Sequence, residues 1–451
     1  MTRLERPAAS PRRARWLAPV LAAAAAAAVA VAAVAVGVTA VSTSGNGDRA
    51  AILPVTQVST PTLGPTPTPS STPPAPRPAS PISARPAATT TPPAQVAAPL
   101  RNGQQADRSQ IPWSQVGPGW HLIASTATPK AVTAPLYLVN PIGGRYLISQ
   151  VAIDSIRAWS PDGRRVLLTG EGAGRFSELE LATGQVLRTF TIPGAAFVSY
   201  TRPTGQAILV EVRVGKGSAA RTTLQRFGTD GRHQRTYPSE LPGLGKLSTH
   251  TVLYSPDGTE LLIGARNGLA LLGNDGHLIR TLPAPAEQRE CDPIKWWDAA
   301  TVLTRCTNHV IKSQFFSWPS ELFLQPVSGG SPTKLAGASA ATPFGVQNAW
   351  RYSGGLLLRE ESGCGPGELD LLRNGVLSKL ALPSGIANPP PLHAVAGDVV
   401  IVDQRMHCSY EPDPVTLIAV NFVTGAKMTL ATGFYNRVVS YPGRDGAARR
   451  Y

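Results

Sequence analysis

From Trp113 onward, the hydrophobic positions fall into short runs, many of them alternating with polar positions, and Gly, Pro, Asn and Asp separate the runs. Runs of this kind predict β-strands joined by tight turns. The stretch SIRAWSPDGRRVLL at 155–168 returns in closely similar form as HTVLYSPDGTELLI at 250–263. The pattern therefore predicts an all-β domain that is built from repeats.

Each repeat is predicted to contain four strands, with the turn after the first strand as its clearest landmark. These turns lie near Gly163, Gly205, Gly258, Ala300, Gly354 and Gly397, at intervals of 42, 53, 42, 54 and 43 residues. A four-stranded unit of about 40–55 residues is typical of a β-propeller blade. Residues 119–149 lack a first strand, and the C-terminal NRVVSYPGRDGAARRY supplies one. We therefore expect a seven-bladed β-propeller whose first and last segments share one blade, which leaves no open sheet edge at the closure.

The repeated turn is explained by its residue types. Pro presets the backbone at the second turn position, Asp accepts hydrogen bonds from nearby amides, and Gly tolerates a positive φ. This chemistry predicts a structural role for the turn, rather than a catalytic or calcium-binding role for its two Asp residues. The turn residues are Ser160, Pro161, Asp162, Gly163, Ser255, Pro256, Asp257 and Gly258.

The repeat resembles that of the TolB-type, WD-like propeller family, whose blades carry W-S-P-D-G before an apolar strand. Residues 159–163 match this motif fully, residues 254–258 match with Tyr in place of Trp, and RPTG at 202–205 is degenerate. The resemblance covers roughly residues 119–451 and implies a platform that binds a protein or another ligand. Propellers serve many roles, so the fold alone does not specify a function.

The N-terminus predicts a membrane anchor. Residues 17–41 form an uncharged apolar run of 25, which as a helix is long enough to cross a bilayer core of about 30 Å. Five Arg residues and one Glu precede it, and this positive charge predicts a cytoplasmic tail over residues 1–16. The alternative is a cleaved secretory signal, because VTA at 38–40 is a tolerable cleavage site. A single-pass signal anchor is favoured because the apolar run exceeds that of usual cleaved signals.

Residues 42–112 are rich in Pro, Thr, Ala and Ser, and are predicted to form a disordered linker. The folded domain would then span residues 113–451, outside the membrane. Either reading of the N-terminus places it in an exported, extracytoplasmic setting. The linker acts either as a stalk that holds the domain away from the membrane or as a passive spacer.

The four cysteines predict two disulfides, because their number is even and the domain is expected to be exported. Cys291 and Cys306 flank a predicted hairpin symmetrically, which favours a bond between them. Cys364 and Cys408 occupy equivalent loops in neighbouring repeats, which favours the second bond. Their spacing does not resemble that of a metal site, and we expect no metal or other cofactor.

The longest predicted loops, at 307–321, 360–368 and 403–414, should share one face of the ring with all four cysteines. They carry aromatic side chains beside acids and histidines, a composition suited to recognition. An alternative is that the aromatic residues only cover blade edges. The candidate binding residues are Phe315, Phe316, Trp318, Glu360, Glu361, His407, Tyr410, Glu411 and Asp413.

No catalytic motif stands out. The sequence contains no G-x-S-x-G elbow, no H-E-x-x-H, no P-loop and no dinucleotide fingerprint. Glu360 and Glu361 with Asp413 are the nearest approach to paired acids, but neighbouring strand residues point to opposite faces. The folded part keeps +7 of the net charge of +14 and has no run of Lys or Arg, which disfavours nucleic acid as a partner.

These observations favour a monomeric binding platform for a protein, peptide or glycan of the cell envelope. The alternative is a propeller enzyme of the lyase or hydrolase type that acts on an envelope substrate.

Overall fold

The computed structural model describes residues 100–128, 130–215, 220–286, 288–308, 319–337, 339, 342, 345–360, 367–384, 386, 392–404, 414–434 and 438–442. All of them belong to the second of the chain's two units, residues 90–451. No helix among these residues is long and apolar enough to cross a membrane. Residues 17–41 lie outside the described ranges, so the membrane anchor stays a prediction.

The described part consists of β-strands and two short 3-10 helices, η1 (Arg108–Gln110) and η2 (Trp113–Gln115). The strands are β1 (Gln105–Asp107), β2 (His121–Ala124), β3 (Thr133–Val139), β4 (Arg145–Ala152), β5 (Ile156–Trp159), β6 (Arg165–Thr169), β7 (Arg175–Glu180), β8 (Val186–Thr191), β9 (Ala195–Tyr200), β10 (Ala207–Val214), β11 (Arg221–Gly228), β12 (His233–Thr236), β13 (Glu240–Leu241), β14 (Gly245–Tyr254), β15 (Glu260–Ala265), β16 (Gly268–Gly273), β17 (Leu278–Pro283), β18 (Gln288–Trp296), β19 (Thr301–Asn308), β20 (Ser320–Pro326), β21 (Thr333–Ala336), β22 (Val346–Tyr352), β23 (Gly355–Glu360), β24 (Leu369–Arg373), β25 (Val376–Lys379), β26 (Leu392–Ala396), β27 (Val399–Asp403), β28 (Val415–Asn421), β29 (Lys427–Gly433) and β30 (Val438–Ser440).

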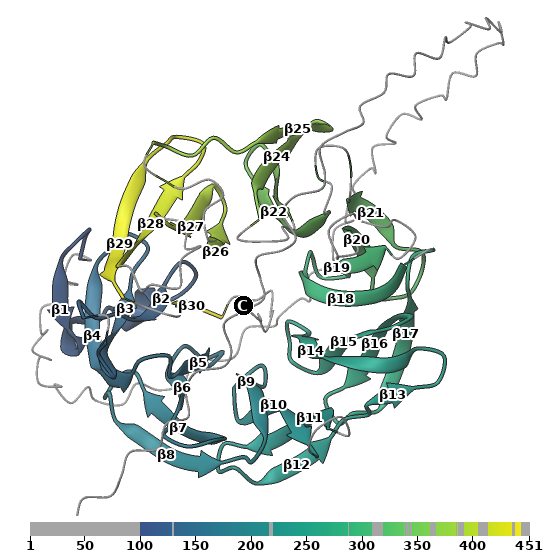
Figure 1. Cartoon of the computed structure of the whole chain (residues 1–451), viewed down its shortest axis with the longest axis horizontal. Helices are drawn as coiled ribbons and strands as arrows, with labels where there is room; N and C mark the ends of the chain where they lie inside the picture. The colour runs from purple at the N-terminus through teal and green to yellow at the C-terminus, as the bar shows by residue number, and fades with distance from the viewer. Residues whose placement is uncertain are drawn as a thin grey trace, which may run out of the picture. The chain divides into compact units, whose positions relative to one another are not determined.

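The sheets follow one another around a ring, as Figure 1 shows. Blades β5–β8, β9–β12, β22–β25 and β26–β29 are separate four-stranded antiparallel sheets, and a fifth sheet of five strands has the order β1-β4-β3-β2-β30. The remaining strands, β13–β21, lie in one nine-stranded sheet. The architecture is therefore a β-propeller, as the repeats predict.

The expectation of seven separate blades is wrong, because the structure has five separate blades and the nine-stranded sheet. The repeats β14–β17 and β18–β21 join where Ala265 on β15 pairs with Cys291 on β18. Gly264 permits this approach, since a Cβ atom there would lie 2.5 Å from the Cys291 carbonyl oxygen. The sequence pattern shows how many repeats there are, whereas the number of separate sheets depends on such local contacts between the repeats.

The ring closes in the five-stranded sheet. His121, Leu122 and Ile123 of β2 pair with Ser440, Val439 and Val438 of β30, so strands from the two ends of the folded part are neighbours. This pairing satisfies backbone groups that would otherwise form an open edge.

The folded part also begins earlier than the sequence predicts. Residues 105–107, which the composition places in the linker, form β1 and pair in parallel with the outer strand β4. The Asn140 side chain donates a hydrogen bond to the Leu100 carbonyl at 2.8 Å, and Arg108 donates one to the Ile148 carbonyl at 2.8 Å. Composition misses this segment because three residues of backbone pairing need no apolar pattern.

The hydrophobic core lies between the blades, where the faces of neighbouring sheets pack together. Between β9–β12 and β14–β17, for example, the buried cluster combines Leu209 and Leu224 with Leu247 and Tyr254. Packing of both faces explains why the second and third strands read as nearly continuous apolar runs.

The S-P-D-G turns are stabilised by hydrogen bonds between their own residues, and they also contact the preceding blade. In the first copy, the Ser160 hydroxyl donates to Asp162 at 2.5 Å, and Asp162 accepts the Arg164 amide at 3.0 Å. Gly258 has a φ of +75°, and its Cα faces the backbone of Arg202 and Pro203 in the neighbouring turn. The turn thus needs glycine both for its conformation and for the close approach of the preceding blade.

Candidate functional site at the loop face

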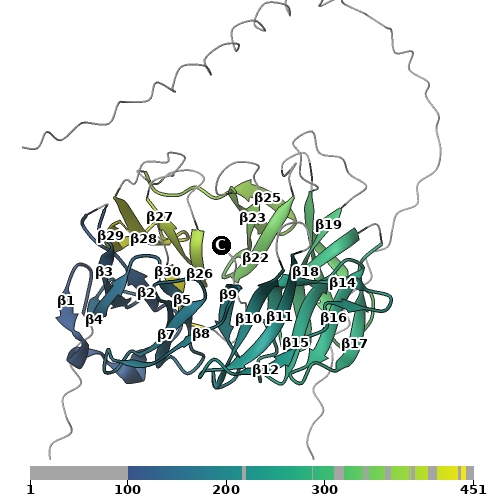
Figure 2. The same ribbon diagram turned by 60° about the horizontal axis from the view of Figure 1, so that its bottom comes forward.

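The two faces of the ring differ in the connections that they carry. One face holds the S-P-D-G turns, and we call it the turn face. On the opposite face the second and third strands of each blade are joined, and we call it the loop face (Figure 2). The described strands β19, β23 and β27 end on the loop face, and β20, β24 and β28 begin there.

Of the nine binding residues proposed from the sequence, only Glu360 lies in the part of the chain that the structure describes. It is the last residue of β23, at the loop face. The other eight lie outside the described residues, as do Cys364 and Cys408. Their grouping with Glu360 stays a prediction.

Glu360 is paired with a residue that the sequence analysis did not single out. Its side chain hydrogen-bonds to Asp370 on the adjacent strand β24, and the two residues are only 7% and 1% exposed. The backbone holds them together, because Leu358 is the cross-strand partner of Asp370 and the Glu360 amide donates to the Glu368 carbonyl at 2.8 Å. A signal was present in the sequence: Asp370 is a charged residue between Leu369 and Leu371 in a mostly apolar strand.

Burial and the hydrogen bond to Asp370 raise the pKa of Glu360 to about 8. Two carboxyl groups in contact away from water cannot both ionise readily, so Glu360 keeps its proton at neutral pH. Lys379 nearby acts in the opposite direction, but it is also engaged with Glu368 in an ion pair. The arrangement can donate a proton or respond to pH at the base of the loop face.

This pair predicts a pH-dependent stability. The pKa of Glu360 is higher in the folded chain than in the unfolded chain, so the folded state binds more protons between about pH 4.5 and 8 and its stability falls as the pH rises through that window. In Glu360→Gln this part of the decline should vanish, a difference of more than ~1 kcal/mol between pH 5 and 8. Urea unfolding of both chains across this range measures it. Parallel pH profiles would contradict the raised pKa of Glu360.

A second acid–base pair lies in the next blade. Nε2 of His393 on the inner strand β26 lies 3.0 Å from Oδ1 of Asp403, the last residue of β27. Asp403 is buried and His393 is partly exposed. A carboxylate that orients an imidazole is one part of a general base. Within the described ranges, no group of three His, Cys, Asp or Glu residues could hold a metal ion.

The disulfide between Cys291 and Cys306 lies at the loop-face end of the same half of the ring. The two residues are cross-strand partners on β18 and β19, and both are buried. This is the pairing that the symmetric spacing predicts. It cross-links the stem from which the connection between β19 and β20 departs.

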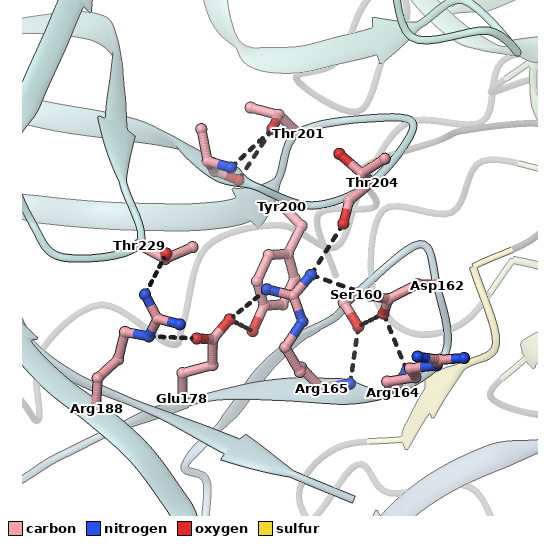
Figure 3. Close-up of polar contacts among 11 residues, drawn as sticks. Ser160, Asp162, Arg164, Arg165, Glu178, Arg188, Tyr200, Thr201, Thr204 and Thr229 are labelled. Atoms are coloured by element: carbon pink, nitrogen blue, oxygen red, sulfur yellow. Dashed lines mark hydrogen bonds and ion pairs between the residues drawn. The ribbon is translucent and has the colours of Figure 1, made fainter.

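On the turn face, charged groups serve to join blades (Figure 3). Glu178 of β7 is fully buried, with Arg165 at 3.0 Å, Arg188 at 2.8 Å and the Tyr200 hydroxyl of the next blade at 3.1 Å. Burial alone would raise the pKa of Asp162, but hydrogen bonds from Ser160, the Arg164 amide and Arg165 outweigh it and the pKa is lowered. Glu178 and Asp162 therefore have structural roles.

Replacing Glu178 by Ala should therefore destabilise the fold by about 2 kcal/mol, because buried partners lose their counter-charge while the half-exposed Arg188 regains water. Glu180→Ala, on the same strand but less buried, is the matched control and should cost no more than ~0.5 kcal/mol. Chemical unfolding of both variants makes the comparison. Equal losses would show that the buried network is not what matters.

Comparison with known proteins yields no family. No protein-family model matches the chain, and no curated protein matches it significantly. Among solved structures, it is similar to a putative TolB from Agrobacterium tumefaciens, with 16% identity, a TM-score of 0.34, and 67% of this chain and 91% of that chain covered. It is also similar to the beta-propeller domain of Myceliophteria thermophila Cps50 (Swd1), with 11% identity, a TM-score of 0.39 and coverages of 62% and 92%. It is similar to a puromycin hydrolase as well, with 15% identity, a TM-score of 0.44, and 75% of this chain and 57% of that chain covered. TolB and other propellers are thus among its structural neighbours, but superpositions this loose carry no argument about activity, and the fold assignment rests on the chain's own strand pairing.

Proposed function

We propose that this protein is an exported, membrane-anchored β-propeller that binds a protein, peptide or glycan of the cell envelope through its loop face. In this account residues 17–41 anchor it as a single-pass protein with its N-terminus inside, residues 42–112 contain the spacer, and the ring lies outside the cytoplasm. Release after signal cleavage would leave the same binding role.

The disulfide between Cys291 and Cys306 is the observation that carries the proposal. Disulfides of this kind persist in oxidising compartments and are rare in the cytosol, which supports export. The bond also braces the loop face rather than the turn face, and binding residues are commonly placed on loops that a rigid scaffold holds. Both facts favour a recognition surface outside the cell.

The alternative function is that of a propeller enzyme of the lyase or hydrolase type. The pair of His393 and Asp403 favours it, because an oriented imidazole on the innermost strand of a blade is suited to proton transfer. This pair is a single observation, whereas the disulfide supports both export and a braced loop face, so the binding role remains the better supported of the two.

A crosslinking pull-down from intact cells tests the proposal. The full chain, tagged at its C-terminus, is compared with a tagged chain that ends after residue 118 and therefore lacks the ring. Enrichment of one envelope protein or polymer that depends on the ring is the expected result. Recovery of the same molecules with both chains would contradict the binding role.

Two sets of substitutions then separate binding from catalysis. Loss of the partner in Trp318→Ala or Tyr410→Ala supports the platform. Loss of turnover with binding retained in Glu360→Ala, Glu361→Ala and Asp413→Ala, or in His393→Ala, supports the enzyme.

A further inference from the structure

Exposed positive charges gather at the loop-face ends of two neighbouring blades. Arg213 and Arg221 flank the connection between β10 and β11, where Val214 is the cross-strand partner of Arg221. Arg266 lies in the connection between β15 and β16, and its amide donates to the Lys246 carbonyl at 3.4 Å. All four side chains are exposed. We call Arg213, Arg221, Lys246 and Arg266 the basic arc.

The basic arc spans the loop-face ends of two sheets that pack together. Leu209 on β10 belongs to the same buried cluster as Leu247 and Ala265 of the next blade. Alternation along a strand places Arg213 on the same side of β10 as Leu209, so its side chain faces the seam between the two sheets. Lys246 directly precedes Leu247, so its side chain points to the opposite face of β14. The four cations therefore spread over the loop-face ends of both blades rather than along one groove.

These four charges are not neutralised by the described parts of the chain. No described carboxylate forms an ion pair with any of them, although Glu240 is the cross-strand partner of Lys246. Several cations elsewhere are paired: Lys334 pairs with Glu321, Lys379 with Glu368, and Arg188 with Glu178. Within the described ranges, these four side chains are thus left out of ion pairs.

We propose that the basic arc binds a flexible, repeatedly anionic polymer of the cell envelope. The inference rests on the proposed function and names the chemistry of its partner. A single exposed ion pair contributes little, so four separated cations on an open surface favour a chain that contacts several of them at once over one small anion. Three of the four are Arg, whose planar fork suits both phosphate and carboxylate oxygens.

The test measures binding of two labelled polymers, inorganic polyphosphate and polygalacturonate, to the purified full chain over a range of salt concentrations. The test variant carries Arg213→Gln, Arg221→Gln, Lys246→Gln and Arg266→Gln. The matched control carries the same change at four exposed cations elsewhere, Arg101, Arg164, Arg235 and Arg280. Unfolding midpoints show that both variants remain folded.

We expect the arc variant to lose at least about tenfold in affinity at low salt and to show a shallower salt dependence, while the control loses less than about twofold. Binding of polyphosphate alone identifies a phosphate-bearing polymer, binding of polygalacturonate alone identifies a carboxylate-bearing one, and binding of both shows that repeated charge suffices. Failure of the unmodified chain to bind either polymer, or equal losses in both variants, would overturn the inference. A partner captured from cells by the arc variant as well as by the unmodified chain would overturn it too, while leaving the binding platform intact.

Discussion

Replacing Gly258 by Ala is expected to cost about 3 kcal/mol or more of folding stability, the largest effect of any single substitution proposed for this chain. Two penalties add. The residue has a φ of +75°, a region that residues with a Cβ atom rarely adopt. The new Cβ would also lie 2.3 Å from the Arg202 carbonyl carbon and 2.5 Å from the Pro203 nitrogen, which are backbone atoms that cannot move aside alone.

Gly397→Ala separates the two penalties. Gly397 occupies the corresponding turn of blade β26–β29 and has a φ of +56°, but a Cβ atom there would have nothing within 4 Å. It should cost only about 1 kcal/mol. Denaturant unfolding of both variants gives the difference. If Gly397→Ala were as destabilising as Gly258→Ala, contact between neighbouring turns would not be a determinant of the ring.

Removing the disulfide is expected to have the second largest effect. The bond closes a loop over a sequence separation of 15, for which chain entropy predicts about 3 kcal/mol. Both cysteines are buried in the cluster that also contains Trp296, Val302 and Phe323. Cys291→Ala with Cys306→Ala should therefore lower the unfolding midpoint substantially.

The reducing agent provides the control for this experiment. A reductant should shift the unmodified chain toward the midpoint of the double variant and should shift the double variant much less. Any shift that persists in the double variant would report the second bond, predicted between Cys364 and Cys408. Peptide mapping under non-reducing conditions tests both pairings, and recovery of Cys291 as a free thiol would contradict the first.

The fold class could be predicted from the sequence because its determinants are local and repeated. Residues 160–163 and 255–258 satisfy their own hydrogen bonds, so the turn can be recognised without knowledge of the rest of the chain. The pairing of Cys291 with Cys306 could be predicted for the same reason, because the two residues flank one hairpin. What the pattern could not predict is the merging of two repeats into one sheet, which depends on a backbone approach at Gly264.

The candidate site was harder to predict from the sequence, because its contacts join residues on different strands rather than neighbours in sequence. The sequence pattern suggests Glu360 together with its neighbour Glu361, whereas in the structure Glu360 contacts Asp370 on the adjacent strand. His393 and Asp403 are ten positions apart and meet only through the hairpin of β26 and β27. Likewise, the basic arc is composed of isolated Lys and Arg residues that no charge run in the sequence marks.

The proposed function requires that the loop face, and not the turn face, meets the partner. It is tested most directly by placing a photo-crosslinking amino acid on opposite faces of the same blades in intact cells. Glu171 and Ser384 are exposed positions in loop-face connections, and Thr183 and Asn374 are their exposed counterparts on the turn face. We expect a discrete crosslinked product from at least one of the two loop-face positions and none from the two turn-face positions. The same product from the turn face, or products from the turn face alone, would contradict it.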